Sequence, residues 1–182
     1  MGYYPLVNHD HRFIFFWNAK CGCTTLKKVI YELAEGEFFE GNIHSHIGYL
    51  NSNKYAVPKE KLVELTGYRK IIVVRDPWSR LVSFYTNKII VSKVETIIDR
   101  TSMLNVSNVS FSDMTQLMTI IKPECFQHHL ELQASGLEEI EFDSVINLTE
   151  MSSLLPKELA TLGGRCCVAK SLSIETTNTC CF

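Results

Sequence analysis

The sequence lacks any apolar run long enough to cross a membrane. Runs such as 13–17 and 71–74 are short, whereas a spanning helix needs about 20 apolar residues. A signal peptide is also missing, because polar and charged residues interrupt the start from His9 to Arg12. The patterns for myristoylation and prenylation are absent as well. For the chain as it stands we therefore expect no transmembrane segment and a cytoplasmic location.

A strong charge of either sign is also lacking. The formal net charge is −2, from 18 Lys and Arg against 20 Asp and Glu. This balance argues against a broad nucleic-acid surface, although it leaves room for a local basic pocket. With 46% hydrophobic and 21% charged residues over 182 positions, the composition is typical of one globular domain.

The sequence also lacks cysteines at the spacing of a metal site. The seven cysteines include Cys21 and Cys23 around Gly22, and two adjacent pairs near the end of the chain. None of them forms the Cys-x2-Cys pattern of a zinc site. We therefore predict free thiols and no metal.

Hydrophobic patterning and turn residues predict an α/β fold. Buried strands are expected at 13–17, 70–74 and 142–148. Helical spacing, caps and breakers predict helices at about 24–34, 59–65, 81–89, 111–121 (capped by Ser110 or Ser112) and 150–162. Strands joined by helical crossovers pair in parallel. We expect one domain over residues 1–164 and a poorly specified tail over 165–182.

The turn after the first strand has the residues of an anion site. It reads Asn-Ala-Lys-Cys-Gly-Cys-Thr-Thr over residues 18–25. Gly22 would let the backbone approach an oxyanion, and the N–H groups of Cys23, Thr24 and Thr25 would point at it from a helix N-terminus. Lys20 adds a positive charge that could neutralise a leaving-group oxygen. This is not a Walker A loop, in which Lys follows the glycines.

The turn after the second strand also carries a cation. Arg75 follows four apolar residues and could be held as a fork for a phosphate. An ion pair with Asp76 or another nearby carboxylate is the structural alternative. In an open α/β sheet, ligands bind beyond the carboxyl ends of the strands. Two such turns therefore suggest a ligand with two separated phosphate-type groups.

These segments resemble a known family. Residues 18–28 look like the 5′-phosphosulfate loop of the carbohydrate sulfotransferase family (sulfotransferase family 2). Residues 73–88 are similar to its 3′-phosphate segment, V-R-[DH]-P-[FW]-x-R-L-[VA]-S-x-[YF]. Residues 129–133 resemble its H-x-x-x-Q element, and 142–150 its late strand and following acidic position. The resemblance covers about residues 12–163, and no comparable counterpart of the family's C-terminal segment is found in 165–182.

The resemblance implies a P-loop NTPase-like three-layer fold with a central, mainly parallel sheet that is short at the C-terminus. It also implies the donor 3′-phosphoadenosine 5′-phosphosulfate (PAPS), with no metal. Carried over by position, the 5′-phosphosulfate would contact Lys20, Gly22, Cys23, Thr24 and Thr25. The 3′-phosphate would contact Arg75 and Ser83. The expected reaction is an in-line transfer of the sulfuryl group to a hydroxyl of a glycan or other small acceptor.

The catalytic base is expected in the loop between the two turns. A base must reach the acceptor hydroxyl at a suitable pKa, which favours histidine. His46 and His44 are the leading candidates, followed by Glu37 and Glu40. His129 could instead position the donor or the acceptor.

Two alternatives remain open from the sequence. One is a non-catalytic PAPS- or nucleotide-binding remnant of the fold, and the less favoured one is a P-loop-type kinase. The compartment has an alternative too: relatives are Golgi enzymes with an N-terminal membrane helix, so a fragment of such an enzyme would be Golgi-located. The sequence leaves the acceptor and the oligomeric state open.

Overall fold

The computed structural model describes residues 5–46, 55–91, 109–122 and 129–161. The chain divides into two compact units. One contains Gly2–Arg75 and Ile140–Thr179, and the other contains Asp76–Glu139.

The first unit is built on a four-stranded sheet in the order β1-β2-β3-β4. Its strands are β1 (Leu6–Asn8), β2 (Phe13–Phe16), β3 (Arg69–Val74) and β4 (Ser144–Asn147). β2, β3 and β4 are parallel, with Phe15 opposite Ile71 and Ile71 opposite Ser144. β1 runs antiparallel to β2 at the edge. The expected mainly parallel sheet is therefore confirmed, and β1 is an addition to it.

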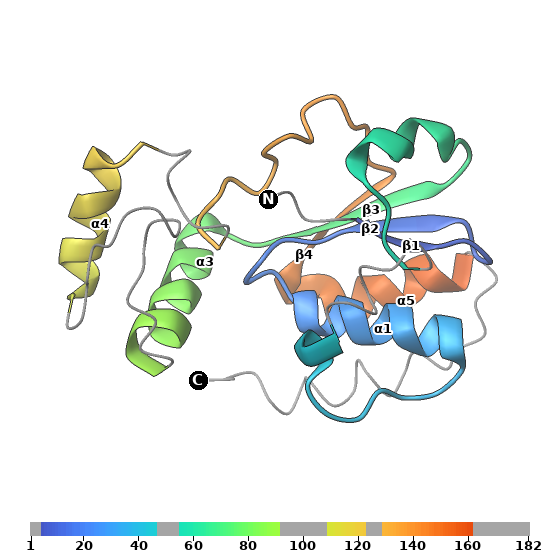
Figure 1. Cartoon of the computed structure of the whole chain (residues 1–182), viewed down its shortest axis with the longest axis horizontal. Helices are drawn as coiled ribbons and strands as arrows, with labels where there is room; N and C mark the ends of the chain where they lie inside the picture. The colour runs from blue at the N-terminus through green and yellow to red at the C-terminus, as the bar shows by residue number, and fades with distance from the viewer. Residues whose placement is uncertain (1–4, 47–54, 92–108, 123–128, 162–182) are drawn as a thin grey trace. The chain divides into compact units, whose positions relative to one another are not determined.

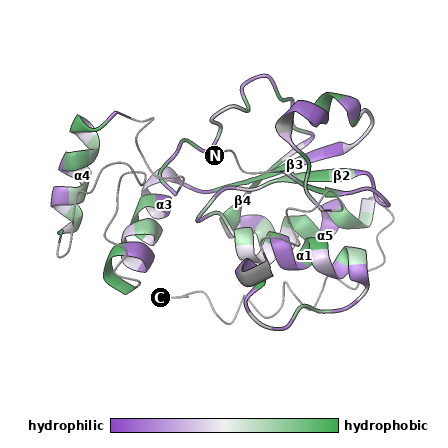
Figure 2. Ribbon diagram, in the orientation of Figure 1, coloured by the Kyte–Doolittle hydropathy of each residue, from purple (hydrophilic) through white to green (hydrophobic). Residues whose placement is uncertain are grey.

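Two helices, α1 (Cys23–Glu35) and α5 (Met151–Thr161), cover one face of this sheet (Figure 1). Alternate strand residues enter one apolar core with them, including Phe15 and Val73 from the sheet, Ile30 from α1 and Leu155 from α5. Each such side chain contributes about 1.5–3 kcal/mol when fully buried. All four residues of β2 are buried, as expected for a central parallel strand, and β2 is accordingly apolar in Figure 2. The described residues give a mixed α/β fold, and the P-loop-like three-layer arrangement stays a prediction.

Helix α1 begins and ends at glycines. Gly22 is its N-cap at φ +73°, and its carbonyl accepts the Leu26 N–H at 3.0 Å. Gly36 is the C-cap at φ +74°, and its N–H donates to Glu32. The helix expected at 24–34 is thus confirmed within one residue at each end.

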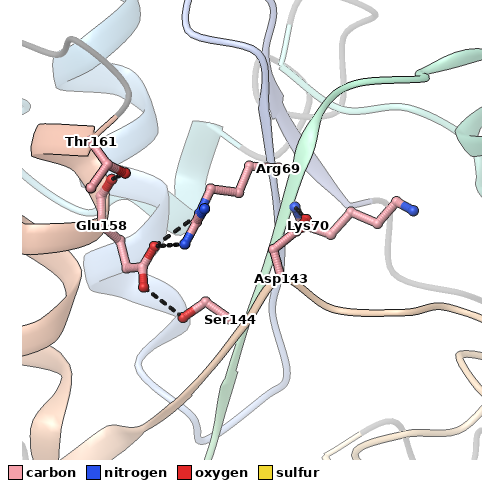
Figure 3. Close-up of polar contacts among 6 residues, drawn as sticks. All are labelled: Arg69, Lys70, Asp143, Ser144, Glu158 and Thr161. Carbon is pink, nitrogen blue, oxygen red and sulfur yellow. Dashed lines mark hydrogen bonds and ion pairs between the residues drawn. The ribbon is translucent and has the colours of Figure 1, made fainter.

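A polar cluster joins the amino ends of the strands to α5 (Figure 3). The Arg69 guanidinium lies 2.7 Å from the Glu158 carboxylate, and the Ser144 hydroxyl donates to the same group at 3.0 Å. Next to it, Lys70 donates its N–H to the Asp143 carboxylate at 2.7 Å. β3 and β4 begin at this polar cluster. Their carboxyl ends therefore lie at the opposite end of the sheet, away from the cluster.

The second unit contains α3 (Pro77–Phe84), the π-helix η3 (Tyr85–Val91) and α4 (Phe111–Ile120). Helix α3 begins with Pro77, and the Asp76 carboxylate caps it by accepting the Ser79 N–H at 2.8 Å. A capping box of Ser110 and Asp113 begins α4, which decides between the two caps expected from the sequence. A small core of Phe84, Met114 and Leu130 holds this unit together.

Other boundaries differ from the sequence expectation. The segment at 59–64 is the 3-10 helix η2 (Lys59–Glu64), and the helix expected through 81–89 changes to π geometry at Tyr85. The third expected strand is shorter, because the 3-10 helix η5 (Leu148–Glu150) precedes α5. The Asn147 amide oxygen accepts the Thr149 N–H at 3.1 Å, which explains why extended backbone stops there. The tail at 165–182 lies outside the described residues.

Candidate functional site

The two predicted anion turns meet at the carboxyl edge of the parallel strands. β2 and β3 are parallel neighbours, so the residues that follow them emerge side by side. The Arg75 guanidinium, directly after β3, donates from Nη1 to the Lys20 carbonyl at 3.2 Å. This hydrogen bond connects the guanidinium of the second turn to the backbone of the first turn.

The backbone of the first turn has an uncommon conformation. Lys20 has φ +67° and Gly22 has φ +73°. The Cys21 N–H donates to the Asn18 carbonyl at 3.2 Å, which closes the turn before the helix begins. A positive φ at a non-glycine residue costs of order 1 kcal/mol or more and occurs often at functional sites. Lys20 is therefore held in its place by the surrounding structure.

The start of α1 provides backbone donors at this turn. Cys23, Thr24 and Thr25 are its first three residues, and Gly22 offers no side-chain cap. The first N–H groups of a helix have no partner within the helix, and the aligned peptide dipoles make this end positive. The arrangement suits an anion.

His44 lies against the first turn. Its Nε2 is 2.8 Å from the Thr24 hydroxyl, although the two residues are 20 positions apart. His44 belongs to η1 (Ile43–His46), and its backbone N–H donates to the Asn42 side chain at 3.0 Å. A hydroxyl predicted to contact the donor and a predicted base thus share one hydrogen bond. The side chain of His46 lies outside the described residues.

The two glutamates of the same loop differ in their surroundings. Glu37 accepts the Tyr31 hydroxyl at 2.9 Å, and this bond raises the pKa of Tyr31. Glu40 is exposed. The Glu37 carboxylate is thus a hydrogen-bond acceptor for Tyr31.

A profile of the family described as "Sulfotransferase family" matches residues 4–155. The chain belongs to the sulfotransferase family. The match contains both turns, η1 and the start of α5.

Curated sulfotransferases are similar to part of this chain. Carbohydrate sulfotransferase 11 of Rattus norvegicus and that of Mus musculus are each 31% identical over 90 residues. The Danio rerio protein of the same name is 33% identical over 92 residues. These matches cover 46% of this chain and 25% of each relative, so the chain matches about a quarter of the length of these relatives. No solved structure matches the chain significantly.

The remaining residues of the sulfotransferase pattern belong to the second unit. Ser83 is half-buried on α3. Arg80, from the same helix, is buried and donates to the Glu131 carbonyl at 2.7 Å. The His129 ring lies 6.1 Å from the Phe84 ring. Arg80 therefore has a structural role, joining α3 to the segment that resembles the H-x-x-x-Q element.

Sequence reasoning assigned no role to two polar residues at the first turn, Lys27 on α1 and Asn18 in the turn itself. Lys27 is 5% exposed, and its ammonium lies 4.3 Å from the centroid of the Trp17 ring. Burial lowers the pKa of Lys27, and the nearby Cys23 acts in the opposite direction. The Asn18 side-chain nitrogen is buried without a hydrogen-bond partner. The position of Lys27 next to the apolar stripe of α1 could have signalled its burial, since Leu26 precedes it and Ile30 follows one turn later.

The described residues contain no group of three His, Cys, Asp or Glu side chains arranged for a metal ion. Within the same residues, no helix has the length and apolarity needed to span a bilayer. Cys21 is buried and Cys23 is half-buried, and neither forms a disulfide bond.

Replacing Gly22 with alanine should lower the free energy of unfolding by about 2–3 kcal/mol, measured by denaturant titration. An alanine at φ +73° costs about 1–2 kcal/mol. Its Cβ would also lie 2.8 Å from Leu148 Cδ1 and 3.1 Å from Met151 Cε, and relieving such overpacking costs about 1 kcal/mol or more.

Gly36→Ala is the matched control for this packing term. Gly36 has nearly the same φ of +74°, but an added Cβ would meet nothing within 4 Å. Gly36→Ala should therefore lower the free energy of unfolding only by the cost of the backbone conformation, about 1–2 kcal/mol. Equal losses for the two variants would contradict close packing of Gly22 against η5 and α5.

Proposed function

We propose that the protein is a PAPS-dependent sulfotransferase that moves a sulfuryl group to a hydroxyl of a carbohydrate or other small acceptor. The observation that carries this proposal is the bond between Arg75 and the Lys20 carbonyl. It brings a guanidinium that can bind a phosphate next to Lys20 and the N-terminus of α1, in a chain that belongs to the sulfotransferase family. The names of the curated relatives support a carbohydrate as the acceptor.

The chemistry of the first turn fits the 5′ end of PAPS. Lys20, Gly22, Cys23, Thr24 and Thr25 would hold the phosphosulfate with backbone N–H groups, hydroxyls and one ammonium. The unpartnered amide nitrogen of Asn18 is a further donor beside them. The buried donor has no acceptor in the described structure, and an unsatisfied buried donor costs about 1–3 kcal/mol.

The second turn would hold the 3′-phosphate through Arg75. A guanidinium has five N–H donors in a fixed fork. It can therefore join a backbone carbonyl and a phosphate at the same time. In this proposal Arg75 keeps the first turn in shape while it recognises the second anion.

We place His44 first among the candidate bases. Its bond to Thr24 holds the imidazole at the start of α1. When the Thr24 hydroxyl turns to an oxygen of the donor, Nε2 of His44 becomes available to the acceptor. The acceptor oxygen then bonds to sulfur, the bond from sulfur to the phosphate oxygen breaks, and His44 takes the hydroxyl proton.

Calorimetric binding of adenosine 3′,5′-bisphosphate tests the donor site. Wild type should bind it at least about tenfold more tightly than adenosine 5′-monophosphate, and Arg75→Ala should remove most of this difference, since one charge-assisted contact is worth about 1.5–3 kcal/mol. Arg75→Lys keeps the charge but loses the fork, so it should recover only part of the preference.

The alternatives give other results. A folded wild type that binds neither nucleotide would contradict the proposal. Binding of ATP that depends on magnesium, without binding of the bisphosphate, would favour the kinase. Tight binding of the bisphosphate with no sulfation of any hydroxyl acceptor would favour the non-catalytic remnant.

A further inference from the structure

Lys27 is a buried cation that the predicted donor contacts do not use. The residue is 5% exposed, and its ammonium lies over the ring of Trp17. Among the described residues, no carboxylate forms an ion pair with Lys27. A buried charge without an opposite charge is costly, so its presence needs an explanation.

The position of Lys27 connects it to the first turn. Trp17 directly precedes Asn18, where the turn begins, and Lys27 lies one helical turn after Cys23. Long side chains on a helix extend toward its N-terminus. The ammonium above Trp17 is therefore directed toward the end of α1 where the anion is expected.

Asn18 gives independent support. Its side-chain nitrogen is buried and has no hydrogen-bond partner. Among the described residues, the Lys27 ammonium on α1 thus has no carboxylate partner, and the Asn18 amide N–H₂ in the turn has no hydrogen-bond acceptor. Both would be satisfied by one anion at the N-terminus of α1.

We infer that Lys27 is a positioning residue of the donor site, whose buried charge is balanced by the 5′ anionic group of the nucleotide. This inference rests on the proposed function. Lys27 acts through the electric field at the first residues of α1, while Lys20 and the backbone N–H groups make the contacts. The cation–π contact with Trp17 holds the ammonium in place when the nucleotide is absent.

The neighbouring Lys28 provides a matched control. It is half-buried on the same helix, and its ammonium lies 5.6 Å from the centroid of the Phe38 ring. Lys27→Met and Lys28→Met remove the same charge and keep a similar stem. A general loss of positive charge would affect both variants equally, whereas the inferred role affects only Lys27.

The test compares two ligands by calorimetry, adenosine 3′,5′-bisphosphate and adenosine 3′-monophosphate, which differ only in the 5′-phosphate. Lys27→Met should reduce the affinity advantage of the bisphosphate about tenfold or more. Lys28→Met should leave it within about twofold, because the Lys28 ammonium lies over Phe38 and not over Trp17, the residue next to the turn. Lys27→Gln, a second neutral variant, should repeat the loss. A role in packing alone would change the melting temperature but not the difference between the ligands.

The outcomes separate the two hypotheses. If wild type gains nothing from the 5′-phosphate, the proposed donor site fails and this inference fails with it. If wild type shows the advantage and both Lys27 variants keep it, the inference alone is overturned. Loss in the Lys27 variants with retention in Lys28→Met supports it.

Discussion

Replacing Lys20 with methionine should lower kcat about 100-fold or more without unfolding the protein. When the bond from sulfur to the phosphate oxygen breaks, negative charge collects on that oxygen. A cation fixed beside it stabilises the transition state more than the ground state, and loss of one such group costs about 10²–10³ in rate. The backbone of Lys20 is fixed in position, since its carbonyl accepts a hydrogen bond from Arg75 and its φ is held at +67°.

The unusual backbone at Lys20 allows a control that separates charge from conformation. Lys20→Met keeps the strained φ, whereas Lys20→Gly relieves it. The free energy of unfolding of Lys20→Gly should therefore be about 1 kcal/mol higher than that of Lys20→Met. Both variants lose the ammonium, so both should lose turnover by a similar factor in single-turnover sulfation assays. Lys20→Arg retains a charge and should keep more activity than either. Near-normal kcat in Lys20→Met would refute the assigned role.

The sequence could predict the central strands and the anion turns because local signals agree there. Apolar runs ended by polar turns indicated β2 and β3, and the parallel pairing expected of these strands is confirmed. The bond from Arg75 to the Lys20 carbonyl is a contact that the sequence did not predict. Gly22, for which the sequence suggested close approach of the backbone to an anion, has φ +73°.

The contacts that could not be predicted depend on tertiary structure. The hydrogen bond between Thr24 and His44 joins a helix to a loop 20 residues away, and no periodic pattern encodes it. Strand β1 has only three residues and depends on pairing with β2. Lys27 was missed because lysine in a helix is usually exposed, whereas here the residue is buried and its ammonium lies over the ring of Trp17.

Replacing His44 with asparagine should reduce kcat by about 10²–10⁴, the usual contribution of a general base. The variant keeps a polar side chain beside Thr24 but cannot take a proton from the acceptor at neutral pH. In wild type, kcat should rise with pH as the base loses its proton, and this rise should be absent in the variant. The measurement is sulfation rate against pH at saturating donor and acceptor.

Donor affinity decides whether His44 is a base or only a support for Thr24. A base leaves the Kd for adenosine 3′,5′-bisphosphate nearly unchanged while kcat falls. A residue that only orients the Thr24 hydroxyl would weaken donor binding and leave the pH profile in place. His46→Asn is the matched variant, because it removes the other candidate from the same loop. If His46→Asn abolishes the pH-dependent rise and His44→Asn retains it, the base is His46. The 2.8 Å contact of His44 then serves to hold the donor-binding threonine.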